Sequence, residues 1–121
     1  MTAFSLRDLE DSPDETTAPI RSKMSLCRNA IEPLVEEEVE RQLQQLPPQM
    51  VKYINPVQVL AYALNRLPAL YATSQEGWHR QQLRARQHLS NQIFMAVRQG
   101  FAAVQKDPLK AATPLQLENH L

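Results

Sequence analysis

The chain has 121 residues, 43% of them hydrophobic, which suits one packed domain and leaves no room for a second. Its only glycines are Gly77 and Gly100, too few for the turns and bulges of a β-rich fold, so we expect an all-α protein. The 13 basic and 13 acidic residues cancel, which disfavours a general nucleic-acid binder because such proteins present a strongly basic face.

The first 22 residues predict a disordered acidic tail. They hold five acidic residues against Arg7 and Arg21, and too few apolar side chains to offset the entropy of ordering. A sharper alternative is that Phe4, Leu6 and Leu9 dock on a partner as a short linear segment. This stretch lacks the continuous apolar region of a secretory signal. No run of about 18 apolar residues occurs anywhere, so we expect a cytoplasmic protein without a membrane span.

A first long helix is predicted between about residues 25 and 46, within a helical domain expected at 23–107 and followed by a polar tail at 108–121. Pro33 allows two interpretations, a helix that begins near it or a longer helix kinked there. We favour the kinked form because the apolar stripe continues upstream of the proline. That stripe, with its three- and four-residue steps, consists of Cys27, Ile31, Leu34, Val35, Val39, Leu43 and Leu46.

A second, shorter helix is predicted from Pro56 to about residue 67. The preceding residues 51–54 have the character of a short β linker, and Asn55 is a good N-cap residue in front of a proline. Pro68 stops this helix because the residue before a proline avoids the helical conformation.

Residues 69–73 are expected to be extended, and Ser74 to begin the capping region of a third helix that continues to about Gln105. Gly100 lies inside this helix, where glycine costs roughly 1 kcal/mol relative to alanine. It therefore marks either the close approach of another helix or a bend.

The patterns of known catalytic and metal sites are missing, so we expect a non-enzymatic protein without a cofactor or metal. His79 and His88 are nine residues apart and thus on opposite faces of one helix, and Cys27 is the only cysteine, which rules out a structural zinc site. Neither a phosphate-binding loop nor a nucleophile elbow occurs. The acidic cluster at 36–40 is typical of a solvated helix face.

The stretch from Lys52 to Trp78 stands apart, because it holds all three tyrosines, two asparagines and Arg66. Arginine can donate two parallel hydrogen bonds to guanine or stack on the base, and tyrosine stacks on any base. Each residue also has a local explanation, since tyrosine can be core, asparagine can cap a helix and arginine suits a helix C-terminus. From the residues alone we expect a helical module with an anion or purine site.

This stretch and its flanks resemble the late competence development protein ComFB family in its cyanobacterial form, over about residues 24–101. The resemblance implies an all-helical homodimer that acts as a receptor for a cyclic dinucleotide, principally cyclic di-GMP, and works through a downstream protein partner. Cyclic di-AMP is the alternative ligand in some relatives. Zinc-binding cysteines of other relatives are absent here, so zinc is not expected. The matching residues are Glu36-Glu37-Glu38-Val39, Gln42-Leu43, Leu46-Pro47, Lys52-Tyr53-Ile54-Asn55, Ala61-Tyr62-Ala63-Leu64-Asn65-Arg66-Leu67-Pro68, Tyr71-Ala72-Thr73-Ser74 and Gly77-Trp78.

Chemistry applied to the matched segment assigns a role to each candidate ligand-binding residue. Guanine recognition falls to Arg66 and Tyr71, base stacking to Tyr62 or Tyr53, hydrogen bonding to Asn55 and Asn65, and phosphate binding to Lys52. A two-fold symmetric ligand suits the dyad of a homodimer, although one ligand per protomer is equally allowed. The main alternative is an adaptor dimer that binds no nucleotide, and DNA binding is disfavoured by the neutral charge.

Overall fold

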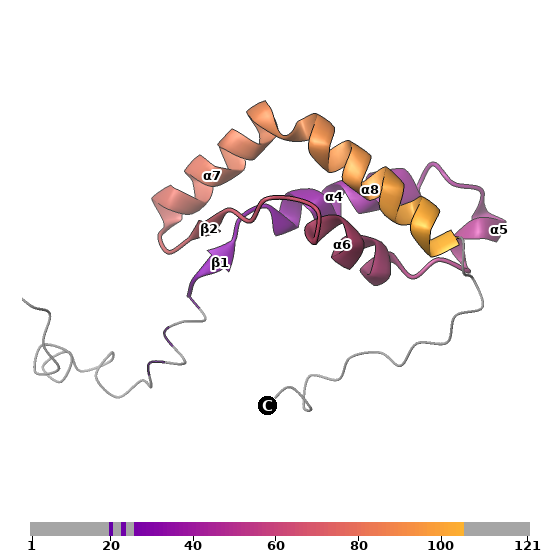
Figure 1. The fold of residues 1–121 in the computed structure, drawn as a ribbon, viewed down its shortest axis with the longest axis horizontal. Coiled ribbons are helices and arrows are strands. Elements are labelled where there is room, and N and C mark those ends of the chain that lie inside the picture. The colour runs from indigo at the N-terminus through magenta and orange to yellow at the C-terminus, as the bar shows by residue number, and fades with distance from the viewer. Residues whose placement is uncertain (1–19, 21–22, 24–25, 106–121) are drawn as a thin grey trace, which may run out of the picture.

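The computed structural model of the chain describes residues 20, 23 and 26–105. The tails expected at 1–22 and 108–121 fall outside the described residues, apart from residue 20. Within that part the predicted all-α class is confirmed, with five helices and two very short strands (Figure 1). In chain order the elements are β1 (Arg28–Asn29), α4 (Glu32–Leu43), α5 (Pro48–Val51), α6 (Pro56–Leu64), β2 (Tyr71–Ala72), α7 (Gln75–His88) and α8 (Ser90–Gln105).

Helix α4 begins at Glu32, with Pro33 in its first turn, so the favoured prediction of a longer, kinked helix is wrong. The chain just before it is extended, because β1 pairs with β2 in antiparallel register. Oδ1 of Asn29 accepts hydrogen bonds from the backbone N–H of Ile31 at 3.3 Å and of Leu70 at 2.8 Å. These contacts with a distant segment hold the upstream residues out of a helix.

The connection between α4 and α6 also differs from the predicted β linker. Residues 48–51 form the single turn of α5, and the backbone N–H groups of Met50 and Val51 both donate to the carbonyl of Pro47. A proline at the first helical position favours such a turn because it has no N–H to satisfy. Residues 52 and 53 follow as a turn.

Helix α6 starts at Pro56, as predicted, and Oδ1 of Asn55 accepts from the N–H of Val57 at 3.0 Å. It ends at Leu64, slightly earlier than expected. Its last residues close tighter turns, in which the N–H of Arg66 donates to the carbonyl of Ala63 at 3.0 Å.

The predicted single C-terminal helix is two helices, α7 and α8, which meet at an angle (Figure 1). Leu89 breaks the helix with φ −119° and ψ 6°, and its side chain packs on the core. The hydroxyl of Ser90 donates to the carbonyl of Arg86, a side-chain bond of the kind that competes with helical backbone bonds. The N-cap predicted at Ser74 is confirmed, because its Oγ accepts from the N–H of Gly77 at 3.0 Å.

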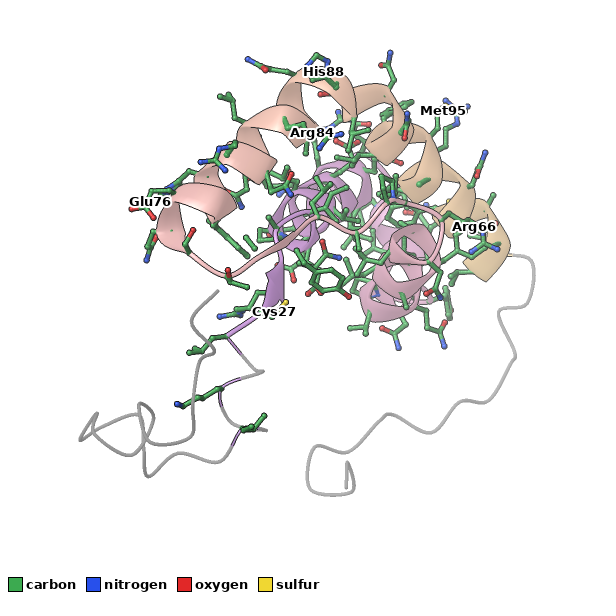
Figure 2. All side chains as sticks on the ribbon, turned by 60° about the vertical axis from the view of Figure 1, so that its left-hand side comes forward. Cys27, Arg66, Glu76, Arg84, His88 and Met95 are labelled. Carbon is green, nitrogen blue, oxygen red and sulfur yellow. The ribbon has the colours of Figure 1, made fainter. Side chains whose placement is uncertain are left out.

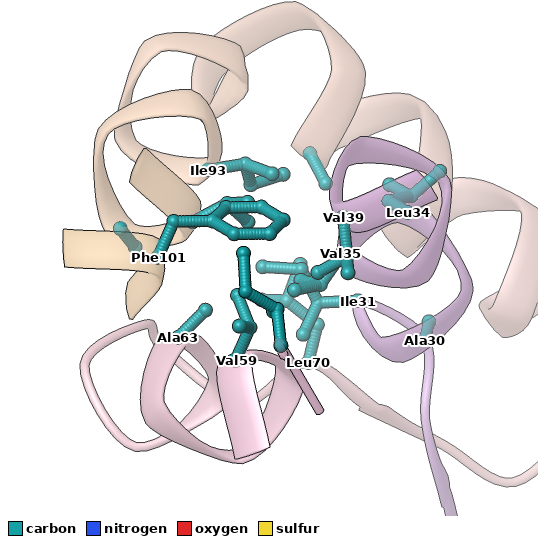
Figure 3. Packing of buried hydrophobic residues seen from close by; sticks show 14 residues of the cluster. Ala30, Ile31, Leu34, Val35, Val39, Val59, Ala63, Leu70, Ile93 and Phe101 are labelled. Carbon is teal, nitrogen blue, oxygen red and sulfur yellow. The ribbon is translucent and has the colours of Figure 1, made fainter. Parts of the chain in front are cut away.

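The core lies between α4, α6 and α8, as Figure 3 shows for its central side chains. Gly100 of α8 is buried against α6. A Cβ atom at this position would lie 3.1 Å from Cγ1 and 3.2 Å from the carbonyl oxygen of Val59. Of the two predicted explanations for this glycine, close approach of another helix is therefore the one the structure shows. The fully buried large side chains are Ile31, Val35, Val59 and Val97.

Candidate ligand site

The seven candidate ligand residues lie at three places rather than in one pocket. Three of them, Lys52, Tyr53 and Asn55, precede α6, and three, Tyr62, Asn65 and Arg66, lie at its C-terminal end. Helix α6, nine residues long, holds its two ends about 14 Å apart. The seventh, Tyr71, is on β2.

At the start of α6 a cation lies beside an exposed ring. Nζ of Lys52 is 5.2 Å from the centroid of the Tyr53 ring, which is 68% exposed. The ring offers a stacking face, and the ammonium group next to it suits a phosphate. Asn55 is first of all an N-cap, since its side-chain oxygen is used by Val57, which leaves its amide nitrogen to donate to a ligand.

At the other end of α6, the guanidinium of Arg66 lies flat over the ring of Tyr62. Its Cζ is 3.4 Å from the ring centroid, and Nη1 donates to the Tyr62 carbonyl at 3.0 Å. Figure 2 shows Arg66 at the edge of the molecule, beside the last turns of α8. This arrangement covers one face of the half-buried Tyr62. Tyr62 therefore positions Arg66, and Tyr53 is the better placed ring for stacking a base.

The remaining residue of this end, Asn65, is the C-cap of α6. Its backbone N–H donates to the carbonyls of Ala61 and Ala63, and its side chain is exposed. The capping function that we considered for Asn65 is thus carried by its backbone, and its amide group faces solvent.

Tyr71 borders a hollow of about 420 Å³ on the α4 side of the β1–β2 ribbon. Two carboxylates, Glu32 and Glu36, line the same hollow together with Arg28 and Trp78. Negative charge at this position disfavours a phosphate group. Tyr71, which is 61% exposed, can contact a base there but not as part of a phosphate site.

A second hollow, of about 360 Å³, lies where β1 and β2 meet the first turn of α7. It contains a cation and an aromatic ring, and no carboxylate is among its lining residues, which are Leu26, Arg28, Ala72, Thr73, Ser74, Gln75 and Trp78. Its volume falls in the range of ligand pockets. We call this hollow the ribbon pocket. The sequence marked Trp78 as the end of the functional stretch, but Arg28 escaped notice because only the strand pairing brings it there.

A third hollow, of about 340 Å³, lies between α4 and the α7–α8 bend, and its charges are already paired. Nη2 of Arg86 is 3.1 Å from Oε2 of Glu37. Burial raises the pKa of Glu38, but hydrogen bonds from Arg41 and Gln42 and the charge of Arg41 outweigh it and hold this pKa below its ordinary value. In turn, Glu38 raises the pKa of Arg41. These groups stabilise one another and leave no free charge for a ligand.

Within residues 20, 23 and 26–105, no three histidine, cysteine or acidic side chains gather as metal ligands would. No helix of that part has the length and apolarity to cross a membrane.

Comparison with protein families gives a match over residues 28–108 with the family described as "Late competence development protein ComFB". The matched range covers every described element and all seven candidate residues. Comparison with curated proteins finds no match.

Proposed function

The chain belongs to the late competence development protein ComFB family, and we propose that it is a non-enzymatic receptor for a cyclic dinucleotide, cyclic di-GMP, that signals through a protein partner. Cyclic di-AMP is the competing ligand. The proposal joins two supports, the family resemblance stated for residues 24–101 and the chemistry presented by the ends of α6.

The observation that carries the proposal is the exposed guanidinium of Arg66. A guanidinium has five N–H donors in a fixed plane, and here one of them is used by the Tyr62 carbonyl. Stacking on Tyr62 holds the plane in place, so less conformational freedom is lost when a ligand binds. The free donors suit the O6 and N7 acceptors of guanine, whereas adenine presents an amino group at the corresponding position.

A homodimer is part of the same proposal. Each end of α6 presents a fragment of a site, a cation and ring at Tyr53 and a guanidinium at Arg66. A ligand with two guanines and two phosphates needs both kinds of group twice, and a two-fold axis supplies each of them twice. We therefore propose that the ligand, cytoplasmic cyclic di-GMP, binds across the two protomers.

Calorimetric titration of the full chain with cyclic di-GMP and cyclic di-AMP tests the proposal. Arg66→Ala should weaken cyclic di-GMP binding by about 1–3 kcal/mol, roughly 5- to 150-fold, the worth of a bidentate arginine–guanine contact. Arg66→Lys should recover little because lysine cannot bind in a bidentate manner. The matched control is Arg98→Ala, which removes an exposed arginine from α8 and should leave affinity unchanged.

Two outcomes would redirect the assignment. Equal binding by Arg66→Ala and wild type, combined with a loss for Arg28→Ala, would move the ligand to the ribbon pocket. If neither cyclic dinucleotide binds, the adaptor alternative replaces the receptor. Thermal unfolding gives an independent reading, because a ligand at 100 times its Kd adds about 2.7 kcal/mol of stability.

A further inference from the structure

Helix α7 presents a basic surface that the proposed receptor function does not use. Its outward face combines the exposed residues Arg80, Leu83 and Arg84, with Leu83 57% exposed between the two arginines. In the described part of the chain, ion pairs join Arg41 to Glu38 and Arg86 to Glu37 but include neither Arg80 nor Arg84. We call Arg80, Leu83 and Arg84 the α7 face.

We propose that the acidic segment 4–15 of this same chain docks on the α7 face. The segment carries five carboxylates against one base, Arg7, and Leu9 stands between Asp8 and Glu10. This is the complement of a leucine flanked by two arginines. Carboxylates pair with guanidinium groups in the strongest class of protein hydrogen bonds. The acidic residues of the segment are Asp8, Glu10, Asp11, Asp14 and Glu15, and its apolar residues include Phe4, Leu6 and Leu9.

The point where this segment joins the described structure favours α7 over other surfaces. Leu26 lines the ribbon pocket together with Gln75 and Trp78, which belong to the first turns of α7. Figure 1 shows β1 and β2 beside that end of α7. The chain upstream of Leu26 therefore starts next to the helix on which we place it.

The length of the connection is sufficient. Eleven residues from Glu15 to Leu26 span up to about 36 Å when extended, whereas Arg84 lies about 14 Å along α7 from Gln75. A short tether within one chain gives a local concentration in the millimolar range. Contacts that are weak between separate molecules are thereby strengthened within one chain.

Charge also favours the acidic segment over nucleic acid as the occupant of the α7 face. Within α7 three arginines, Arg80, Arg84 and Arg86, stand against Glu76, and one of the three is already paired with Glu37. That surplus is small for a polyphosphate backbone, and the chain carries an equal number of acidic and basic residues in total. The five carboxylates of segment 4–15 outnumber the two arginines that form no ion pair in the described part, so the segment can pair both without a second molecule.

Paramagnetic relaxation in the full-length chain tests the docking. A nitroxide is attached at Ser5→Cys in a Cys27→Ser background, because Cys27 is an exposed free thiol. Docking predicts broadening of the α7 amides around Arg80–Arg84 and none along α6. Broadening should fade as NaCl rises from about 0.01 M to about 1 M, over which the Debye length falls from about 30 Å to about 3 Å.

Charge reversal supplies the decisive comparison. Arg80→Glu with Arg84→Glu should abolish the broadening, and Arg98→Glu on α8 should leave it unchanged. Reversing the segment as well, with Asp8→Lys, Glu10→Lys and Asp11→Lys, should restore it. A circular dichroism spectrum of each variant verifies that its helix content is retained.

Three results would overturn the proposal. The first is that the nitroxide does not broaden the α7 amide signals at low salt. The second is broadening that appears only when spin-labelled and isotope-labelled chains are mixed, which would place the segment on a second copy. The third is unchanged broadening in the variant with Arg80→Glu and Arg84→Glu, combined with chemical-shift changes of the α7 amides when a single-stranded oligonucleotide is added.

Discussion

Two regions of the molecule differ in how much side-chain surface they bury. The body consists of α4, α6 and α8, and the arm consists of β1, β2 and α7. In the body, side chains such as Val35, Val59 and Val97 have no exposed surface at all. In α7, the only buried residue is Ala85. Besides Ala85 and the partly buried Trp78, which pack on the core, the arm is held by a two-residue strand pair, a serine cap and one exposed ion pair to α4.

This difference affects how much each region contributes to stability. Burial of apolar surface is the dominant favourable term in folding, so the body contributes most of the stability of the domain. The arm contributes little burial, and its polar exposed side chains are available for contacts with something else. Its low local burial is also the physical mark of a segment that opens more easily than the core.

Replacing one leucine in each region should give the largest contrast. Leu34→Ala removes a side chain that is 5% exposed in the core and should destabilise by about 2–5 kcal/mol through lost burial and the cavity left behind. Leu83→Ala removes a 57% exposed side chain from α7 and should cost less than about 0.5 kcal/mol. Urea unfolding measures both. Equal losses would mean that α7 is packed on another surface in solution.

The two glycines offer the next contrast. Gly100→Ala would place a Cβ 3.2 Å from a carbonyl oxygen of α6, so backbone must move, and we expect a loss of about 1–3 kcal/mol despite the better helix propensity of alanine. Gly77→Ala meets only the Ser74 hydroxyl, at 3.1 Å, and the Ala72 Cβ, at 3.7 Å. It should be nearly neutral in thermal unfolding. A stabilised Gly100→Ala variant would show that α6 and α8 are farther apart.

Local signals were sufficient to predict parts of both regions. The Asn55–Pro56 start of α6, the Ser74 cap and the extended segment at 69–73 follow from residues within a few positions of each feature. Such features depend on backbone chemistry that neighbouring residues determine, and this is why the sequence reveals them.

Features that depend on distant contacts escaped prediction. The extended β1 requires Asn29 to bond Leu70, 41 positions away. The break at Leu89 lies inside an apolar pattern that continues through it, and only packing of that leucine on the core selects the bend. The candidate site shows the same limit, because no local signal in the sequence indicates that α6 separates Tyr53 from Arg66.

Removing a helix cap should produce a smaller and more local effect. Ser74→Ala deletes the side-chain bond to Gly77 and should cost about 1 kcal/mol. Because the arm buries little, amide hydrogen exchange should accelerate in α7 more than in α8. Ser74→Asp, which can still cap, should retain protection. Asn55→Ala is the counterpart in the body and should lower global stability without singling out α6. Uniform acceleration in Ser74→Ala would mean that arm and body unfold together.

The smallest expected effect comes from a comparison of two acidic side chains of α4. Glu38 is largely buried in its ion pair, and Glu37 is exposed in its ion pair. The Glu38 side chain, only 17% exposed, accepts from Arg41 and from Nε2 of Gln42 at 2.7 Å, and the same nitrogen donates to the Phe94 carbonyl of α8 at 3.1 Å. Its pKa is lowered in the folded state. Its charged form therefore adds stability above the unfolded pKa, and this stability is lost as pH falls through the folded pKa.

Glu38→Gln should thus lower the free energy of unfolding at pH 7 by about 0.5–1 kcal/mol and make its fall below about pH 5 shallower. Glu37→Gln breaks the exposed pair that joins α4 to α7, in which the carboxylate is 63% exposed, and should cost close to nothing because water and salt screen such pairs. Urea titrations from pH 7 to pH 3 measure both variants. A larger loss for Glu37→Gln would reverse the comparison, because the arm would then be held to the body by charge and not merely placed beside it.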